Sequence, residues 1–300
     1  MNPEVRRYDR AVSEAASTSS QSRRAFNRTL LRVGIALAFL HFGFRKLFGR
    51  LAAAAEEKLP TAPEKLGARS GMTIDLDRCT GCGACVVGCR TENNVPFFGP
   101  TEEAKGTGIY WMALLPVGGS GELPEHGHAD MLPRPCMHCE NPACVKVCPT
   151  NATYQTEDGV VAQIFDRCIG CRYCQVACPY GVRSFNFAEP QWPESYRSYI
   201  NPDVATRPKG VVEKCTFCGH RLRDAHERAQ LDGRMPRDAE LRRLPACAQV
   251  CPADAIAFGD LNDPASEVSI LASSPRAFRL LEYIGTKPKV IYLGKDRRRT

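Results

Sequence analysis

Hydrophobic and polar residues divide the chain into an N-terminal segment and a larger remainder. Residues 1–22 are polar and show no apolar period, which is typical of a flexible leader. A stretch of 15 mostly apolar residues follows, from Leu30 to Phe44, interrupted by Arg32. We therefore expect residues 1–55 to be distinct from the folded part of the protein and residues 56–71 to link the two.

Short runs in the remainder predict strands. Residues 72–76 and 255–259 each predict one strand, and residues 150–154 predict another, followed by a turn and a β-rich run over residues 158–164. Residues 219–229 form an amphipathic helix pattern with charge on most faces. This pattern favours a solvated surface helix over a helix that docks a partner.

The most unusual feature of the composition is its sixteen cysteines, which fall into four groups of four with no thiol left over. The groups, called motifs one to four below, are Cys79, Cys82, Cys85, Cys89; Cys136, Cys139, Cys144, Cys148; Cys168, Cys171, Cys174, Cys178; and Cys215, Cys218, Cys247, Cys251.

The spacing within the motifs indicates iron–sulfur clusters. Motifs one and three read C-x2-C-x2-C-x3-C, the spacing of two-cluster ferredoxins. Motif two has two extra residues before its third cysteine, and motif four is split by 28 residues. Three thiolates on one tight loop can hold three corners of a cubane, and Gly81, Gly83 and Gly170 permit the close backbone approach. The sequence therefore predicts four [4Fe-4S] clusters.

Zinc is the main alternative, because C-x2-C pairs also form zinc knuckles. Zinc sites usually combine two separated pairs, whereas three of the four motifs are uninterrupted, which favours clusters over zinc and over a disulfide framework. Since thiolates supply every cubane corner, the histidines are expected at the surface or beside the ligands rather than as ligands: His126, His128, His138, His220 and His226.

The fourth cysteine of each motif starts a helix that points away from its own loop, so we expect it to reach the partner cluster. Motifs two and three then form an inner ferredoxin-like domain, and motifs one and four form an outer one around it. The expected ligand sets are Cys79, Cys82, Cys85 with Cys251; Cys215, Cys218, Cys247 with Cys89; Cys136, Cys139, Cys144 with Cys178; and Cys168, Cys171, Cys174 with Cys148.

The predicted fold class is α+β, with two nested ferredoxin-like domains that each bind two [4Fe-4S] clusters and carry long loop and helix insertions. The expected boundaries are 72–135 for the first part of the outer domain with its insertion; 136–181 for the inner domain; 182–214 for an insertion; 215–265 for the second part of the outer domain, with an insertion at 219–246; and 266–300 for a C-terminal docking tail.

The formal charge of +7 does not indicate nucleic-acid binding. Residues 1–55 carry ten Lys or Arg against three Asp or Glu, while the rest of the chain balances at 30 against 30. Each oxidised cubane with its thiolates adds about two negative charges, so the loaded protein would be acidic. We therefore expect no nucleic-acid partner.

The basic residues near the N-terminus fit an export signal. The pair Arg23-Arg24, with Phe26 two residues on, precedes the apolar stretch and a small-residue run at 52–55, an order that resembles a twin-arginine signal. A membrane anchor is the alternative, but 15 residues are fewer than the roughly 20 needed to span a bilayer. Twin-arginine export carries folded proteins, so clusters could be inserted before export. The predicted export signal spans residues 1–55, and whether and where it is cleaved stays open.

Several segments resemble the four-cluster iron–sulfur subunit of complex iron–sulfur molybdoenzymes, the group that includes dimethyl sulfoxide, polysulfide and tetrathionate reductases. The resemblance covers residues 72–295 and rests on the four motifs and on segments 91–96, 167–174, 213–218, 258–264 and 285–290. The insertions are also similar to the iron–sulfur part of alternative complex III. In that relative the third motif lacks a cysteine, whereas Cys171 is present here, so four cubanes are expected.

The resemblance implies a non-catalytic subunit that relays single electrons between a quinone-reactive membrane subunit and a molybdopterin or multihaem cytochrome subunit, on the periplasmic side of the cytoplasmic membrane. A free-standing polyferredoxin is the alternative, but it would need neither an export signal nor long insertions. A self-contained enzyme is disfavoured, because no Gly-rich phosphate loop and no spaced nucleophile–base pair is present. No small-molecule substrate is therefore expected, and the direction of electron flow stays open.

Overall fold

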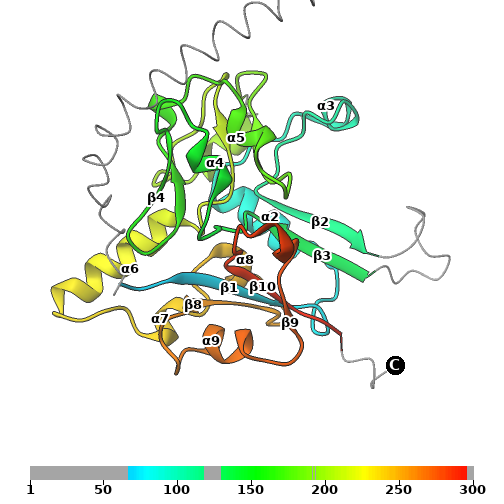
Figure 1. Cartoon of the computed structure of the whole chain (residues 1–300). Helices are drawn as coiled ribbons and strands as arrows, with labels where there is room; N and C mark the ends of the chain where they lie inside the picture. The colour runs from blue at the N-terminus through cyan, green and yellow to red at the C-terminus, as the bar shows by residue number, and fades with distance from the viewer. Residues whose placement is uncertain (1–66, 118–129, 191, 193, 296–300) are drawn as a thin grey trace, which may run out of the picture. The chain divides into compact units, whose positions relative to one another are not determined.

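A four-stranded sheet of order β8-β1-β10-β9 organises the structure, a computed structural model that describes residues 67–117, 130–190, 192 and 194–295 (Figure 1). Its strands are β1 (Ser70–Asp75), β8 (Ile256–Asp260), β10 (Val290–Leu293) and β9 (Ala277–Phe278). The expected export signal, most of the linker, and His126 and His128 lie outside the described residues. The described residues belong to one compact unit, residues 65–300.

The register of the sheet joins distant parts of the chain. β1 pairs antiparallel with β8, which places Met72 opposite Phe258, and parallel with β10, which places Met72 opposite Val290. β1 and β10 are buried along their whole length. Met72, Ile74 and Leu76 alternate with Thr73 and Asp75, the period of two that predicts a strand, although the polar Thr73 and Asp75 are buried here as well. The strands expected before motif one and after motif four are thus both present, and they are neighbours.

Three two-stranded sheets among the described residues lie outside this sheet. They pair β2 (Met112–Val117) with β3 (Asp130–Pro135), β4 (Thr153–Gln155) with β5 (Val161–Gln163), and β6 (Ser184–Phe185) with β7 (Val212–Glu213). The β4–β5 hairpin is the strand–turn–strand expected between motifs two and three. In Figure 1 it lies with the short helices of these motifs in the upper half of the picture, apart from the four-stranded sheet.

Most helices are short. The α-helices are α2 (Ala84–Glu92), α3 (Pro100–Ala104), α4 (Ala143–Lys146), α5 (Tyr173–Val176), α6 (Gly219–Leu231), α7 (Asp238–Leu241), α8 (Ala246–Gln249) and α9 (Glu267–Ala272), and single 3₁₀ turns span Phe165–Arg167, Glu194–Tyr199 and Glu282–Ile284. The surface helix expected over 219–229 is α6. Among the described residues, no helix has the length and apolar character needed to cross a membrane.

The C-terminal region contributes more to the core than its expected role as a docking tail implies. β10 comes from this region, lies between β1 and β9, and is fully buried. The Tyr292 hydroxyl donates a hydrogen bond to the carbonyl of Pro133 at 2.9 Å, which ties the strand to the β2–β3 hairpin. Residues 290–293 are therefore part of the folded core. The sequence analysis missed this because a four-residue strand carries little pattern of its own.

The insertion at 182–214 is held against the end of α2 by a buried ion pair. Arg207 and Glu213 are both fully buried, and their Nη2 and Oε2 atoms are 2.8 Å apart. Arg207 also donates to the backbone carbonyls of Asn93 and Asn94, each at 2.7 Å, and Glu213 accepts from the indole of Trp111 at 2.8 Å. These hydrogen bonds supply partners for the guanidinium and for Oε2 of Glu213, which a buried pair requires, while Oε1 of Glu213 is buried without a partner among the described residues. The insertion thereby fixes the backbone just after motif one.

Replacing Ile291 with alanine tests the role of β10. Ile291 is fully buried, so Ile291→Ala should cost about 2–5 kcal/mol of stability. The matched control is Ile270→Ala on α9, where the side chain is 60% exposed and the cost should stay within about 0.5 kcal/mol. Urea denaturation of the cluster-loaded protein under anaerobic conditions measures both, and equal midpoints for the two variants would show that β10 does not belong to the core.

Candidate functional site

The four C-x2-C loops share one conformational feature. The residue before the second cysteine has a positive φ in every loop: 70° at Gly81, 42° at His138, 70° at Gly170 and 56° at Phe217. Only glycine adopts this region freely, and a residue with a side chain is strained there by about 1–3 kcal/mol. The loops therefore share a left-handed residue at this position, although only two of them contain glycine there.

The two strained residues pack against each other. The rings of His138 and Phe217 stack with centroids 3.7 Å apart, and both side chains are buried. His138 Nδ1 accepts a hydrogen bond from the backbone N–H of Val161 at 3.1 Å, and burial lowers the pKa of His138 well below its usual range, so the ring is neutral. This stack joins the loop of motif two to the loop of motif four. It has no signature in the local sequence.

The thiols of motif one face the last cysteine of the chain. Cys79, Cys82, Cys85 and Cys251 line one cavity, whose apolar wall includes Leu114 of the β2–β3 hairpin. Burial, followed by the charges of the other three thiols, raises the pKa of Cys85 to about 11. These four are the cysteines that the sequence predicts as the first ligand set.

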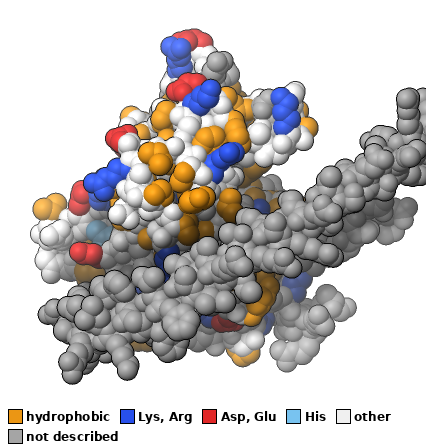
Figure 2. All heavy atoms as spheres, turned by 45° about the horizontal axis from the view of Figure 1, so that its top comes forward, with side chains coloured by type: hydrophobic (Ala, Val, Ile, Leu, Met, Phe, Trp, Pro, Cys, Tyr) orange, Lys and Arg blue, Asp and Glu red, His pale blue; other side chains and the backbone are white. Residues whose placement is uncertain are grey.

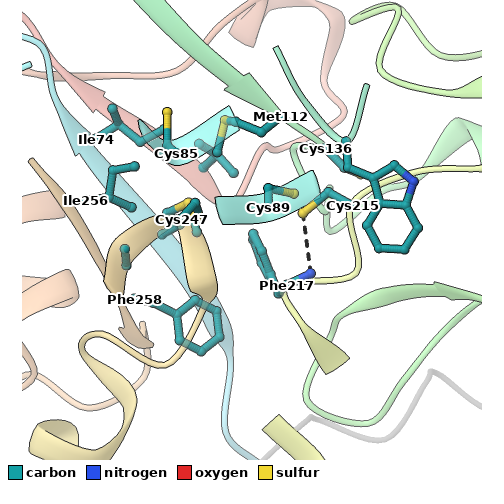
Figure 3. Packing of buried hydrophobic residues seen from close by; sticks show 14 of the residues in the cluster. Ile74, Cys85, Cys89, Met112, Cys136, Cys215, Phe217, Cys247, Ile256 and Phe258 are labelled. Atoms are coloured by element: carbon teal, nitrogen blue, oxygen red, sulfur yellow. Dashed lines mark hydrogen bonds between the residues drawn. The ribbon is translucent and has the colours of Figure 1, made fainter. Parts of the chain in front are cut away.

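Helices α2 and α8 bring the second expected set together. Burial, and then the charges of Cys215, Cys218 and Cys247, raise the pKa of Cys89 well above its usual range. The helices approach closely because position 88 is a glycine, where a Cβ would come within 2.7 Å of a methyl group of Val250. Figure 3 shows Cys89 and Cys215 side by side in this region.

The third expected set also converges. Burial raises the pKa of Cys139 to about 12, and the charges of Cys136, Cys144 and Cys178 add to the effect. Thr286, from the segment before β10, donates to Cys139 and also shares a 2.5 Å hydrogen bond with the hydroxyl of Tyr180.

The fourth expected set has a more open environment. Burial raises the pKa of Cys174, and the neighbouring charges include Cys168 of the same motif and Cys144 of motif two. Cys171 is exposed. Cys148 is only partly buried: burial acts to raise its pKa, but hydrogen bonds from the backbone N–H of Thr153 and from Thr150 outweigh that effect and lower the pKa.

Amide groups donate hydrogen bonds to several cysteine sulfurs. Asn93 lies one helical turn after Cys89, and its Nδ2 donates to the backbone carbonyl of Cys89 at 3.0 Å and to Sγ of Cys218 at 3.5 Å. In the sequence, Asn93 stands only within the family-like segment 91–96 and no role is predicted for it. Its spacing of four residues from Cys89 would place the two on one face of a helix, and this was a usable signal. Four backbone N–H groups donate to sulfur at 3.3–3.4 Å, from Thr153 to Cys148, Phe217 to Cys215, Ala246 to Cys218, and Ala255 to Cys251.

These donor sets fit iron–sulfur clusters. A buried thiolate is unstable unless a positive charge compensates it, and coordination to iron supplies that charge. The backbone N–H groups that point at sulfur are the donors by which proteins hold such clusters and adjust their potentials. Among the described residues, no three His, Cys, Asp or Glu side chains are placed to hold a single metal ion. Of the described histidines, His138 lies beside the ligands and His220 pairs with Glu92 at 2.6 Å.

Comparison with known families agrees with this chemistry. Two models of a 4Fe-4S dicluster domain match the chain, one over residues 128–193 and the other over residues 78–152 and 167–255. The protein is thus of the 4Fe-4S dicluster class. Two such domains and sixteen cysteines correspond to four [4Fe-4S] clusters.

Comparison with individual relatives identifies a family within this class. The iron–sulfur cluster-binding subunit of menaquinone reductase from Nitratidesulfovibrio vulgaris is 48% identical over 231 residues, which cover 75% of this chain and 88% of the relative. One chain of polysulfide reductase from Wolinella succinogenes is 36% identical over 228 residues (76% and 95%), and one subunit of tetrathionate reductase from Salmonella typhimurium is 35% identical over 252 residues (82% of each). The protein belongs to this family of iron–sulfur subunits, as its motifs predicted.

A methyl group at position 170 should disrupt one cluster. The Cβ of Gly170→Ala would lie 2.3 Å from the carbonyl oxygen of Gly210, so the loop of motif three must move. We expect iron to fall by about four atoms per chain, the content of one cubane. Gly181→Ala is the matched control, because Gly181 also has a positive φ but no atom within 4 Å of its Cβ position. Iron and sulfide analysis checks both, and full iron in the Gly170 variant would contradict the prediction.

Proposed function

We propose that this protein is the electron-transfer subunit of a membrane-associated respiratory reductase, and that its sixteen cysteines hold a relay of four clusters in two nested units. When bound, each cluster supplies a centre that accepts and releases one electron. The convergence of thiols from sequence-distant motifs is the observation that carries the proposal, since Cys85 and Cys251 share one cavity although 166 positions separate them.

The nested arrangement is supported by the strand pairing and by the thiol neighbourhoods. β1 and β8, which flank motifs one and four, are partners in the sheet, while the β4–β5 hairpin lies between motifs two and three. The exchange of fourth cysteines is supported by the charge coupling of Cys89 with motif four and of Cys139 with Cys178. The proposed ligand sets are those expected from the sequence.

The chain's own residues would hold the clusters, exclude water from the middle of the relay and leave its ends open. Cys215, Cys218 and Cys247 are buried, whereas Cys82 and Cys171 are exposed. Ile169, Tyr173 and Val176, around Cys171, are 67%, 64% and 84% exposed. Figure 2 shows hydrophobic side chains gathered on the side of the molecule that carries motifs two and three. Exposed apolar groups beside a ligand suit contact with another redox subunit.

We propose a quinone-reactive membrane subunit as one partner and a molybdopterin or multihaem cytochrome subunit as the other. The relatives support this, because they are named as parts of menaquinone, polysulfide and tetrathionate reductases. The paired Arg23 and Arg24 support a location on the periplasmic side of the membrane, reached in the folded state.

Exchange of the fourth cysteines is tested by comparing ligand variants. Cys251→Ser and Cys82→Ser should alter the EPR signal of one and the same cluster, because the two residues belong to one proposed set. Cys247→Ser, whose residue lies only four positions from Cys251, should alter a different signal. The unaltered protein should contain about sixteen irons. If Cys251→Ser and Cys247→Ser change the same signal, the ligand sets are wrong; about four zincs and no iron would refute the relay itself.

The export proposal is tested with both paired arginines. Arg23→Lys together with Arg24→Lys keeps the charge but removes the arginine pair, so cluster-loaded protein should accumulate in the cytoplasm. Arg6→Lys with Arg7→Lys is the control, because it changes an arginine pair that lies in the polar leader and is not followed by the apolar stretch. Cell fractionation followed by immunoblotting measures the distribution. Equal amounts of both variants in the periplasm would show that the pair is not an export signal.

A further inference from the structure

Arg183 is a buried charge whose hydrogen-bond acceptors are neutral. Its side chain is 3% exposed, and Nη1 donates to Oγ1 of Thr153 at 3.3 Å and to Oε1 of Gln163 at 3.1 Å. Nη2 is buried and has no oxygen or nitrogen acceptor among the described residues. A guanidinium is always charged, and burying it without compensation is costly. Its position therefore requires negative charge nearby.

The nearest negative charges come from two different motifs. Burial acts to lower the pKa of Arg183, but the charges of Cys144 and Cys174 outweigh it and raise the pKa. The charge of Cys136, which also belongs to motif two, acts in the same direction. Cys144 belongs to motif two and Cys174 to motif three, so the guanidinium lies between two proposed cluster sites.

A second contact leads to the same pair of sites. Thr153, which accepts a hydrogen bond from Arg183, donates its backbone N–H to Sγ of Cys148 at 3.4 Å. In the proposed ligand sets Cys148 completes the cluster of motif three. Arg183 thus interacts with the cluster site of motif two through the charge of Cys144. It interacts with the cluster site of motif three through the charge of Cys174 and through its hydrogen bond to Thr153.

We propose that Arg183 acts as a fixed positive charge shared by the two clusters of the inner unit, and that it raises the reduction potential of both. The inference rests on the proposed ligand sets. Adding an electron to a cluster increases its negative charge, and a buried cation stabilises the reduced form because the low dielectric around it screens little. The cation also reduces the repulsion between neighbouring clusters when both are reduced.

Potentiometric titration followed by EPR tests this on the full chain, with each signal assigned beforehand by the cysteine variants. Arg183→Met should lower the equilibrium constant for one-electron reduction of each inner cluster at least tenfold. A tenfold decrease corresponds to a reduction potential that is about 59 mV lower. The two outer clusters, held by motifs one and four, should keep their potentials and serve as an internal control. Arg228→Met on α6, where the side chain is 77% exposed and paired with Asp224, should shift none of the four.

A second pair of variants separates charge from packing. Arg183→Lys keeps the charge, so the reduction potentials of the inner clusters should stay close to those of the unaltered protein. Arg183→Gln keeps a hydrogen-bond donor for Thr153 but not the charge, so it should lower these potentials as Arg183→Met does. Equal potentials for Lys and Gln variants, or full iron with unchanged inner potentials in Arg183→Met, would overturn the inference. Fewer than about sixteen irons in the unaltered protein would instead refute the four-cluster relay.

Discussion

The structure depends on the burial of thiolates in groups of four. A single buried thiolate is unstable without a compensating charge: burial, with the charges of neighbouring thiols, raises the pKa of Cys215 and of Cys139 to about 12 each. Iron provides the compensation, so the protein around it has two tasks: it must bring four sulfurs to each cluster and donate hydrogen bonds to them. The positive-φ loops, the N–H groups that point at sulfur, and the insertion that holds Asn93 in place all serve these tasks.

The chemistry of the site could be predicted from the sequence because it is encoded in local spacing. Three cysteines within one short loop can each ligate one iron of the same cubane, and this spacing can be recognised without knowing the rest of the fold. The strands beside the motifs and helix α6 could be predicted for the same reason. The family and its cofactors followed from the motifs, and the comparisons agree.

What could not be predicted depends on contacts between distant segments. Arg183, His138 and Phe217 have no local pattern, since their partners come from other motifs. β10 was assigned to a tail because four residues carry too weak a signal, and only pairing with β1 reveals its place. Phe217 is the clearest case: a bulky residue at positive φ contradicts local preference, and the surrounding packing holds it there.

The parallel pairing of β1 with β10 also bears on how the protein is made. β1 begins at Ser70 and β10 at Val290, so more than 200 residues must be synthesised after β1 before the sheet can be completed. The cavity lined by Cys79 and Cys251 likewise cannot form until Cys251 has been synthesised. The proposed outer sites can therefore be completed only after Cys251 has left the ribosome, whereas the last cysteine of the proposed inner sites is Cys178, so the inner clusters can be inserted earlier than the outer ones.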